Sequence, residues 1–297
     1  MRMARILTVD DVPTNLQILN VHLTDEQYEV VECHSGEAAL NELAQDPESI
    51  DLILLDVIMP VMSGLEVLAQ LKRNPLTEHI PVILITSNGE DQNVAEGLDM
   101  GAFDYIIKPY SQVVLLARVR AALREKERLD LLEKWATTDP LTELMNRRHF
   151  FELADRELAQ SHRSGRPLSF IMLDIDFFKQ VNDTHGHLVG DQVLIELAVL
   201  LKDQLRRVDF CGRYGGEEFV LCLPDTPAEG ALEVAERIRS QVEQLAIDTP
   251  NGPLNFTISL GIAQNNNDKS VEEILKRADD ALYQAKEAGR NQAQSAA

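Results

Sequence analysis

Residues 51–56 read Asp-Leu-Ile-Leu-Leu-Asp, a run of four apolar residues that stops at Asp56. A short run that is apolar at every position predicts a strand buried on both faces, as in a parallel sheet covered by helices. Comparable runs, each followed by a stretch with helical spacing, lie on both sides of it. The runs span residues 5–9, 28–33, 81–85 and 104–107, and the helical stretches span 14–23, 36–43, 64–72, 93–100 and 112 onward. The pattern predicts a doubly wound α/β domain with five parallel strands over residues 1–124.

The last helical stretch of this domain continues far past the point where its sheet ends. Residues 113–137 contain neither Gly nor Pro, and the first half of the stretch is needed to cover the sheet. Residues 125–137 have no sheet left to cover, and Lys126 and Asp130 interrupt their apolar stripe. We expect residues 125–137 to be a helical linker that pairs with a second copy of itself.

Composition limits the classes of partner. The chain of 297 residues carries 28 Lys and Arg against 49 Asp and Glu, a net charge of −21. This balance argues against nucleic acid or an anionic membrane as a partner. The apolar runs fall far short of the ~20 residues of a membrane span. Three cysteines without CxxC spacing indicate reduced thiols, and we expect a cytoplasmic protein.

A second domain is expected over residues 138–297. Asp139 and Pro140 predict a helix N-cap followed by Pro at the first helical position, and therefore a helix over residues 141–162. Strands are expected at 168–174 and 254–263, a hairpin at 210–223, and helices at 177–182, 191–206, 229–245 and 271–288. Because the strands are connected partly by a hairpin and partly by helices, this is an α/β domain with a mixed sheet.

Polar residues stand where the strands of the first domain end. Asp10 and Asp11 follow the first strand, Asp56 the third, Thr86 the fourth and Lys108 the fifth. Ligands of open parallel sheets bind at the carboxyl ends of the strands, so these side chains should converge. Three carboxylates together favour Mg²⁺, and Asp56, in the middle of the sheet, is suited to accept a phosphoryl group. The alternative for each residue is an ordinary turn or cap.

Taken together, residues 4–122 resemble a response-regulator receiver domain. The matching motifs are Asp10-Asp11, Asp56-Val57-Ile58-Met59-Pro60, Thr86-Ser87 and Lys108-Pro109. The resemblance implies that a histidine kinase phosphorylates Asp56.

Further roles in this domain follow from the same resemblance. It implies that Asp10, Asp11, Asp56 and the carbonyl of Ile58 hold one Mg²⁺. It also implies that Lys108 contacts the phosphate and that Thr86 and Tyr105 form the switch pair. A half-buried strand aromatic is the alternative for Tyr105.

The second domain has a different acidic pattern. Asp174 and Asp176 end a predicted strand with spacing that points both side chains the same way. Gly215 and Gly216 permit a tight hairpin turn, and Glu217 and Glu218 follow. Carboxylates at that turn can meet Asp174 and hold Mg²⁺ between nucleotide phosphate oxygens. The alternative is a glycine turn with solvent-exposed acids.

Residues 136–293 resemble the GGDEF family of diguanylate cyclases, with Gly215–Phe219 in the GGEEF form. Further matching motifs are Asp139-Pro-Leu-Thr, Asn146-Arg147-Arg148, Asp174-Ile-Asp-Phe-Phe-Lys179, Asn182-Asp183, Gly190-Asp191, and Lys286 with Gly289-Arg290-Asn291. The resemblance implies a palm-like nucleotidyl-cyclase fold that joins two GTP into cyclic di-GMP and two pyrophosphates. Glu143 departs from the family pattern, which has Gly there, and this puts the local loop geometry in question.

The resemblance also implies the roles of individual residues. Asp174, the carbonyl of Ile175 and Glu217 would hold two Mg²⁺, and Glu217 or Glu218 would help to remove the proton of the attacking 3′-hydroxyl. GTP would be bound by Leu141 near the base, Asn182 and Asp191 on guanine, Gly216 at the turn, and Phe178, Lys179, Lys286 and Arg290 on the triphosphate. Lys179 would belong to the catalytic set as well. Cations that favour a helix C-terminus are the alternative for Lys286 and Arg290.

A third site follows from Arg206 and Asp209, which match the RxxD product-inhibition motif of the family. The resemblance implies that these two residues, with Arg237 as a secondary contact, bind cyclic di-GMP. Arginine suits this role because its planar fork meets phosphate oxygens two at a time. A helix-end ion pair is the alternative.

The sequence therefore predicts a phosphorylation-regulated diguanylate cyclase. One GTP site supplies half of a two-fold product, so two catalytic domains must face each other in a homodimer. Two rival functions remain: a non-catalytic receptor for cyclic di-GMP, and a transcription factor. The intact GGEEF motif argues against the first, and the acidic second domain without a helix-turn-helix pattern argues against the second.

Overall fold

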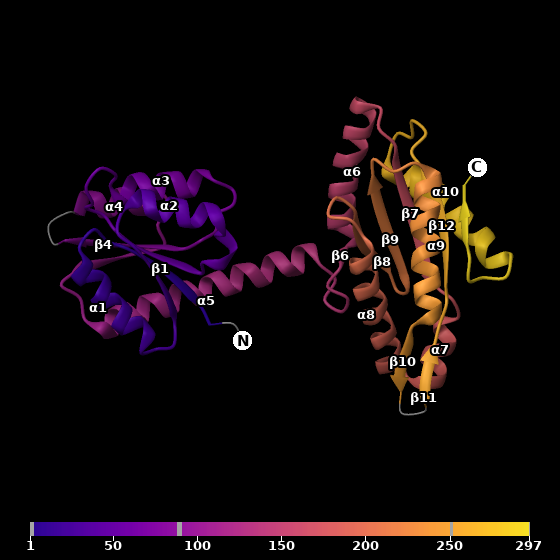
Figure 1. Ribbon diagram of the computed structural model, residues 1–297, viewed down its shortest axis with the longest axis horizontal. Coiled ribbons are helices and arrows are strands. Elements are labelled where there is room, and N and C mark those ends of the chain that lie inside the picture. Colours follow the sequence, from indigo (N-terminus) through magenta and orange to yellow (C-terminus); the bar gives the residue numbers. More distant parts are fainter. Residues whose placement is uncertain (1–2, 88–90, 250–251, 297) are drawn as a thin grey trace. The chain divides into compact units, whose positions relative to one another are not determined.

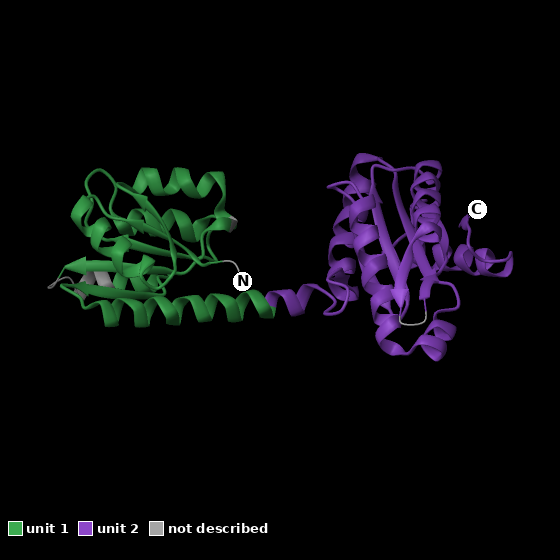
Figure 2. Cartoon of the chain, turned by 60° about the horizontal axis from the view of Figure 1, so that its bottom comes forward, with its two compact units in different colours: residues 1–132 green, residues 133–297 purple. Residues whose placement is uncertain are grey.

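The computed structural model describes residues 3–87, 91–249 and 252–296. The outermost ends of the two expected domains, residues 1–2 and 297, lie outside the described residues. The chain divides into two compact units, residues 1–132 and residues 133–297 (Figure 2). Each unit is described by itself.

The first unit is built on a five-stranded parallel sheet with the strand order β2-β1-β3-β4-β5, which confirms the predicted doubly wound fold. Its elements in chain order are β1 (Arg5–Val9), α1 (Pro13–Thr24), β2 (Glu29–Cys33), α2 (Gly36–Gln45), the short 3₁₀ helix η1 (Pro47–Ser49), β3 (Leu52–Asp56), α3 (Gly64–Arg73), β4 (Val82–Ser87), α4 (Asp91–Asp99), β5 (Asp104–Lys108) and α5 (Gln112–Thr137). Helices α2 and α3 cover one face of the sheet, and α1 and α5 cover the other (Figure 1). Their apolar side chains form a core on each face.

Strand β3 lies at the centre of this sheet, and all five of its residues are buried. Its apolar side chains alternate between the two helical layers, with Ile53 and Leu55 toward α2 and α3, and Leu52 and Leu54 toward α1 and α5. Helix α3 begins close to the end of β3. A Cβ atom on Gly64 would lie 2.2 Å from the carbonyl oxygen of Asp56, so only glycine permits this approach.

Helix α5 is continuous over 26 residues, and its two halves have different environments. Its buried residues, Leu115, Leu116, Val119 and Ala122, all lie in the first half and cover the sheet. The second half exposes apolar side chains at Leu129 (49 %), Leu131 (44 %), Leu132 (44 %) and Trp135 (67 %). None of the helices in the described residues has the length and apolarity needed to cross a membrane.

The second unit contains a six-stranded sheet with the order β13-β12-β7-β9-β8-β6 and a separate two-stranded sheet, β10-β11. Its elements are β6 (Met145–Asn146), α6 (Arg147–Ser164), β7 (Leu168–Ile175), α7 (Phe178–His185), α8 (His187–Gln204), β8 (Phe210–Gly215), β9 (Glu218–Pro224), α9 (Ala228–Gln244), β10 (Ala246–Thr249), β11 (Gly252–Asn255), β12 (Ile258–Gln264), α10 (Val271–Glu287) and β13 (Ala293–Ser295). Strand β7 is antiparallel to β9 and β12, whereas β6 is parallel to β8. The predicted mixed α/β sheet is thus confirmed.

Alternate side chains of β7 enter two cores in this unit. Ile171, Leu173 and Ile175 pack with α8 and α9, whereas Phe170 and Met172 pack with α6 and α10. This alternation follows from the two-residue period of a strand. It places Asp174, the next residue in the second series, on the side of α10.

The predicted helix over residues 141–162 starts too early. Helix α6 begins at Arg147, with Asn146 as its N-cap. Asp139 closes a turn instead, because its Oδ1 accepts hydrogen bonds from the backbone N (2.9 Å) and Oγ1 (2.8 Å) of Thr142. Glu143 has a φ of 54°, which a helix does not accommodate, and the chain then pairs with β8 through β6.

The predicted strand over residues 254–263 is two strands in different sheets. Strand β11 pairs with β10, whereas β12 pairs with β7. The chain leaves the first pairing at Phe256, which is buried, and Thr257, whose hydroxyl donates to Asp176. The short strands β6, β10 and β13 were not predicted. Helix α8 also begins earlier than expected, directly after Gly186 at a φ of 86°.

Candidate functional site

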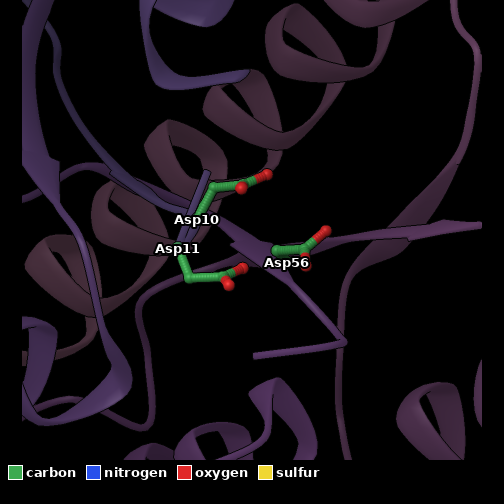
Figure 3. Close-up of side chains that lie close together, drawn as sticks. All are labelled: Asp10, Asp11 and Asp56. Atoms are coloured by element: carbon green, nitrogen blue, oxygen red, sulfur yellow. The ribbon is translucent and has the colours of Figure 1, made fainter. Parts of the chain in front are cut away.

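The first unit gathers three carboxylates at the carboxyl ends of β1 and β3. One oxygen from each of Asp10, Asp11 and Asp56 lies within 4.8 Å of the others (Figure 3). Asp10 and Asp56 are buried, with 1 % and 6 % of their surface exposed. Three hard oxygen donors at this spacing fit Mg²⁺. Across the described ranges no other group of three acidic, His or Cys residues reaches this proximity.

Lys108 lies over this acidic cluster. Its Nζ is 2.9 Å from Asp10 Oδ2 and 2.5 Å from Asp56 Oδ1. Burial alone would lower the pKa of Lys108, but the bonds to Asp56 and Asp10 outweigh burial and raise it. Burial raises the pKa of Asp56, while Lys108 opposes that rise. The lysine therefore balances part of the buried negative charge.

Asn15 orients Asp10, a role that the sequence pattern alone did not predict. Its Nδ2 donates to both carboxylate oxygens of Asp10 at 3.0 and 2.9 Å, and the backbone N of Val12 donates to Oδ1 at 2.8 Å. A polar residue in the first turn of the helix after the acidic strand end was the available signal. These bonds fix the carboxylate before any ligand binds.

The expected switch residues lie on neighbouring strands. Thr86 is the second-to-last residue of β4 and is buried, and Tyr105 lies on β5 two residues before Ile107, the partner of Thr86 in the strand register. Arg118 from α5 stacks over the Tyr105 ring at 5.6 Å and pairs with Asp104. Tyr105 is thus partly buried against a cation. Ile58 lies in the loop after β3 and exposes 54 % of its surface.

In the second unit, β7 and β9 bring Asp174 and Glu218 opposite each other in the strand register. The Nζ of Lys286, in the last turn of α10, lies 2.9 Å from Asp174 Oδ2. Burial raises the pKa of Asp174, Lys286 lowers it, and the charges of Glu217 and Asp176 raise it again. Burial and the nearby Asp174 also raise the pKa of Glu218. The structure thus concentrates negative charge at the end of the β7–β9 pair where Asp174 faces Glu218.

The turn between β8 and β9 carries Glu217. Gly216 adopts a φ of 36°, and the strand register shifts between Arg213 and Gly215. Arg213 holds the turn, because its Nε and Nη2 donate to the carbonyl of Gly216 at 3.0 and 2.7 Å. The sequence pattern did not predict this role of Arg213.

Asp176, grouped with Asp174 on spacing, has a different environment. Its carboxylate accepts from Thr257 Oγ1 and Ser259 Oγ, each at 2.7 Å, and from the backbone N of Asn291 at 3.1 Å. Strand β7 ends at Ile175, so the alternation stops before Asp176. Asp176 therefore tethers the loop after α10 and the start of β12.

The residues expected to read guanine meet where α7 joins α8. A Cβ atom on Gly190 would lie 1.9 Å from Asn182 Oδ1 and 3.4 Å from Phe178 Cζ. A larger residue at 190 would therefore push the Asn182 side chain away from the start of α8, where it lies beside Asp191, whereas Phe178 would be in ordinary van der Waals contact. Leu141 packs against the same core from the loop before β6.

Lys179, Lys286 and Arg290, which are expected to bind the triphosphate, each have a different environment. Lys179 is exposed on α7, and Lys286 is paired with Asp174. The guanidinium of Arg290 stacks over the Phe177 ring at 4.6 Å. Lys286 and Arg290 are thus each held by a neighbouring side chain.

The structure brings Arg206 and Asp209 together but not Arg237. The backbone N of Arg206 donates to Asp209 Oδ2 at 3.0 Å, and Asp209 Oδ1 is buried without a hydrogen-bond partner. Both residues line a pocket of about 490 Å³ with Lys202. Arg237 binds Gln204 instead, through Nε to Oε1 (3.0 Å) and Nη2 to the backbone carbonyl (2.9 Å). In the described part of the chain Arg206 and Asp209 form no side-chain ion pair.

Comparison with known proteins matches both units. The family model described as "Diguanylate cyclase, GGDEF domain" matches residues 136–292, and the "Response regulator receiver domain" model matches residues 6–120. The chain is 35 % identical over 297 residues to the response regulator PleD of Caulobacter vibrioides, covering 97 % of this chain and 64 % of PleD. It is 45 % identical over 164 residues to diguanylate cyclase A of Treponema denticola, covering 54 % and 44 %. The chain thus spans less than two thirds of these relatives.

Solved structures agree with the fold of the second unit. The GGDEF domain of DgcB from Caulobacter crescentus, crystallised in complex with c-di-GMP, is 38 % identical with a TM-score of 0.53, covering 54 % of this chain and 93 % of that chain. The diguanylate cyclase SiaD from Pseudomonas aeruginosa, in complex with its activator SiaC, is 41 % identical with a TM-score of 0.54, covering 62 % and 72 %. The chain therefore belongs to the GGDEF-domain diguanylate cyclase family and carries a response-regulator receiver domain before its GGDEF domain.

Proposed function

We propose that this protein is a receiver-controlled diguanylate cyclase that condenses two GTP molecules into cyclic di-GMP with release of two pyrophosphates. The observation that carries the proposal is the pairing of Asp174 with Glu218 in register, with Lys286 on Asp174. Carboxylates on facing strands next to a lysine suit a metal-dependent triphosphate site. Membership of the family supports the same reaction.

The donor set fits Mg²⁺ in both domains. Asp174, Glu217 and the carbonyl of Ile175 offer hard oxygens for two ions in the cyclase domain, and the raised pKa of Asp174 reflects burial that a cation would offset. Asp10, Asp11, Asp56 and the carbonyl of Ile58 offer oxygens for one ion in the receiver. When bound, magnesium neutralises phosphate charge and favours displacement at phosphorus.

The side chains around GTP position it for in-line attack. Asn182 and Asp191 supply an amide and a carboxylate for the edge of guanine, and Leu141 packs near the base. Phe178, Lys179, Lys286 and Arg290 bind the triphosphate, and the backbone at Gly216 lies beside it. Glu217 or Glu218 accepts the proton of the 3′-hydroxyl. Catalysis then depends mainly on positioning and charge neutralisation, as in phosphoryl transfer generally.

In the receiver, Asp56 accepts a phosphoryl group from a histidine kinase. Lys108 contacts Asp56 already and is placed to bind the new phosphate oxygens. The added charge of about two units draws the Thr86 hydroxyl inward, and Tyr105 moves with it. This change in the receiver controls the output domain.

The active form is a homodimer. Each GTP site supplies half of the product, so two cyclase domains must face each other. The exposed apolar residues in the second half of α5, Leu129, Leu131, Leu132 and Trp135, support pairing of this helix with its copy. Tethering raises the effective concentration of the two cyclase domains.

Product feedback is proposed at Arg206 and Asp209. The buried, unpartnered Oδ1 of Asp209 offers an acceptor for guanine N–H groups, and the exposed Arg206 offers a phosphate contact. Arg237 acts there only after it leaves Gln204.

Chromatography of products formed from GTP and Mg²⁺ tests the proposed activity. The wild-type chain should form cyclic di-GMP, and Glu217→Ala should form none while still folding. Binding of cyclic di-GMP by a wild-type chain that consumes no GTP would instead support the rival function, a non-catalytic receptor.

A further inference from the structure

Two sequence motifs of the cyclase domain have no place in the site described above. Residues 139–142 and residues 146–148 lie outside the GTP and product sites, apart from Leu141 near the base. In the structure both motifs contact the last turn of α5 or residues 212–213 of β8. Their contacts join these two elements.

The first set of contacts holds the end of α5. The carbonyl of Ala136, in its last turn, accepts from Asn146 Nδ2 at 2.9 Å and from Arg148 Nη2 at 3.3 Å. Asn146 also accepts from the backbone N of His149 and so starts α6. A carbonyl at a helix C-terminus lacks an intrahelical partner, so these bonds fix the direction in which α5 ends.

The second set of contacts connects Asn146 and Asp139 to the Gly215-Gly216 turn. Asn146 pairs with Arg213 in the register of β6 and β8. The Arg213 Nη1 donates to both oxygens of Asp139 at 3.1 and 3.3 Å, while its other nitrogens bind the Gly216 carbonyl. The side chains of Arg213 and Asp139 are only 17 % and 19 % exposed, so solvent screens this ion pair weakly.

We propose that Asp139 and Arg213 are positioning residues that couple the end of α5 to the Gly215-Gly216 turn. The inference rests on the proposed cyclase activity and adds the route by which α5 affects it. A shift of the last turn of α5 moves the segment from Thr138 to Asn146, and with it Asp139. Arg213 transmits this shift to the carbonyl of Gly216, the residue directly before Glu217. Misplacing a catalytic group by about 1 Å can lower the rate about a hundredfold.

The test uses conservative variants of the full-length chain. Arg213→Lys keeps the positive charge but loses the planar guanidinium group, whose separate nitrogens bind the Gly216 carbonyl and Asp139 at the same time. Asp139→Asn keeps the acceptor for Thr142 but loses the charge that holds Arg213. Asp225→Asn is the matched control, because Asp225 pairs with Arg166 at 3.0 Å elsewhere in the same domain.

Two readouts separate positioning from folding. Initial rates with GTP, with and without beryllofluoride, give kcat, KM and the stimulation ratio. Hydrogen–deuterium exchange of the peptide covering residues 213–219 reports the order of the turn without any need for activity. Thermal unfolding of each variant checks that it is folded.

We expect Arg213→Lys to lower kcat by roughly tenfold with an unchanged KM for GTP. Asp139→Asn should bring the stimulation ratio toward one and speed exchange in residues 213–219. The double variant should be no worse than Arg213→Lys, because both changes break one chain of contacts. Asp225→Asn should match the wild type.

Additive losses in the double variant, or unchanged exchange at the turn in Asp139→Asn, would overturn the coupling. The coupling would also be overturned if Asp225→Asn changed the stimulation ratio and the exchange as much as Asp139→Asn does. If the wild-type chain forms no cyclic di-GMP, the proposed function fails. The exchange experiment would still test whether Asp139 and Arg213 hold the Gly215-Gly216 turn.

Discussion

Glu143 occupies a left-handed backbone conformation, with a φ of 54°, where the family pattern has glycine. A side chain at this φ is strained, because Cβ approaches the following carbonyl oxygen. The Glu143 carboxylate pairs with Lys134 at 2.6 Å, and this contact offers partial compensation. The departure from the family pattern thus sits at a residue whose backbone would favour glycine.

Variants of Glu143 separate the strain from the ion pair. Glu143→Gly removes both, whereas Glu143→Ala removes the ion pair and keeps the strain. We expect Glu143→Gly to unfold at a higher urea concentration than Glu143→Ala, as measured by circular dichroism. The reverse order would show that the conformation carries little strain.

Asp139 makes the stability of the cyclase domain depend on pH. Burial raises the pKa of Asp139, but hydrogen bonds from Thr142 and the charge of Arg213 outweigh burial and lower it. A lowered folded-state pKa stabilises the fold above the ordinary Asp value of about 3.9, and this stability disappears as the pH falls through the folded-state pKa. The difference in unfolding free energy between wild type and Asp139→Asn should therefore be largest near neutral pH and shrink in acid. A difference that grows in acid would contradict the assignment.

At the scale of single residues, the sequence predicted the acidic cluster of the receiver well. The ends of parallel strands meet at one edge of the sheet, so the convergence of Asp10, Asp56 and Lys108 follows from the strand pattern alone. The roles of Asn15 and Arg213 do not follow, because they depend on which carboxylate or carbonyl each side chain reaches in three dimensions. Arg237 shows the same limit, since its partner is Gln204.

At the scale of elements, long periodic segments were predictable and short pairings were not. The buried run of β3 and the uninterrupted helix α5 follow directly from local sequence. Strands β6, β10 and β13 have two to four residues and form only because a neighbouring strand is present. The Asp139-Pro140 signal for a helix start was overridden by the turn that Asp139 closes with Thr142.

The junction of α7 and α8 provides a test at this scale. In Gly190→Ala the new Cβ would overlap Asn182 Oδ1 and force that side chain away from its present position. We expect the KM for GTP to rise about tenfold, the factor that corresponds to 1.4 kcal/mol of lost binding. Initial-rate kinetics measure the change.

Gly230→Ala is the matched control, because Gly230 also lies near the start of a helix and its new Cβ would meet only Thr226 and Pro227 at 3.2 Å or more. An unchanged KM in Gly190→Ala, or an equal rise in the control, would argue against Asn182 as a guanine contact.

At the scale of the whole molecule, the second half of α5 is central to the proposed homodimer. Replacing Leu129 and Leu132 with Glu places charge in the proposed helical contact and should lower the molar mass measured by light scattering. Cyclic di-GMP formation should fall with it, because facing catalytic domains are needed. Leu76→Glu changes a leucine in the receiver that is even more exposed (65 %) and is the control. A dimer that survives the double substitution would place the contact elsewhere.

Control of the cyclase by Asp56 is the central claim, and the rate of cyclic di-GMP formation from GTP and Mg²⁺, with and without beryllofluoride, tests it most directly. Beryllofluoride should raise the rate of the wild-type chain and leave the rate of Asp56→Asn unchanged. Equal stimulation of both chains, or a wild-type rate that does not respond, would contradict the account.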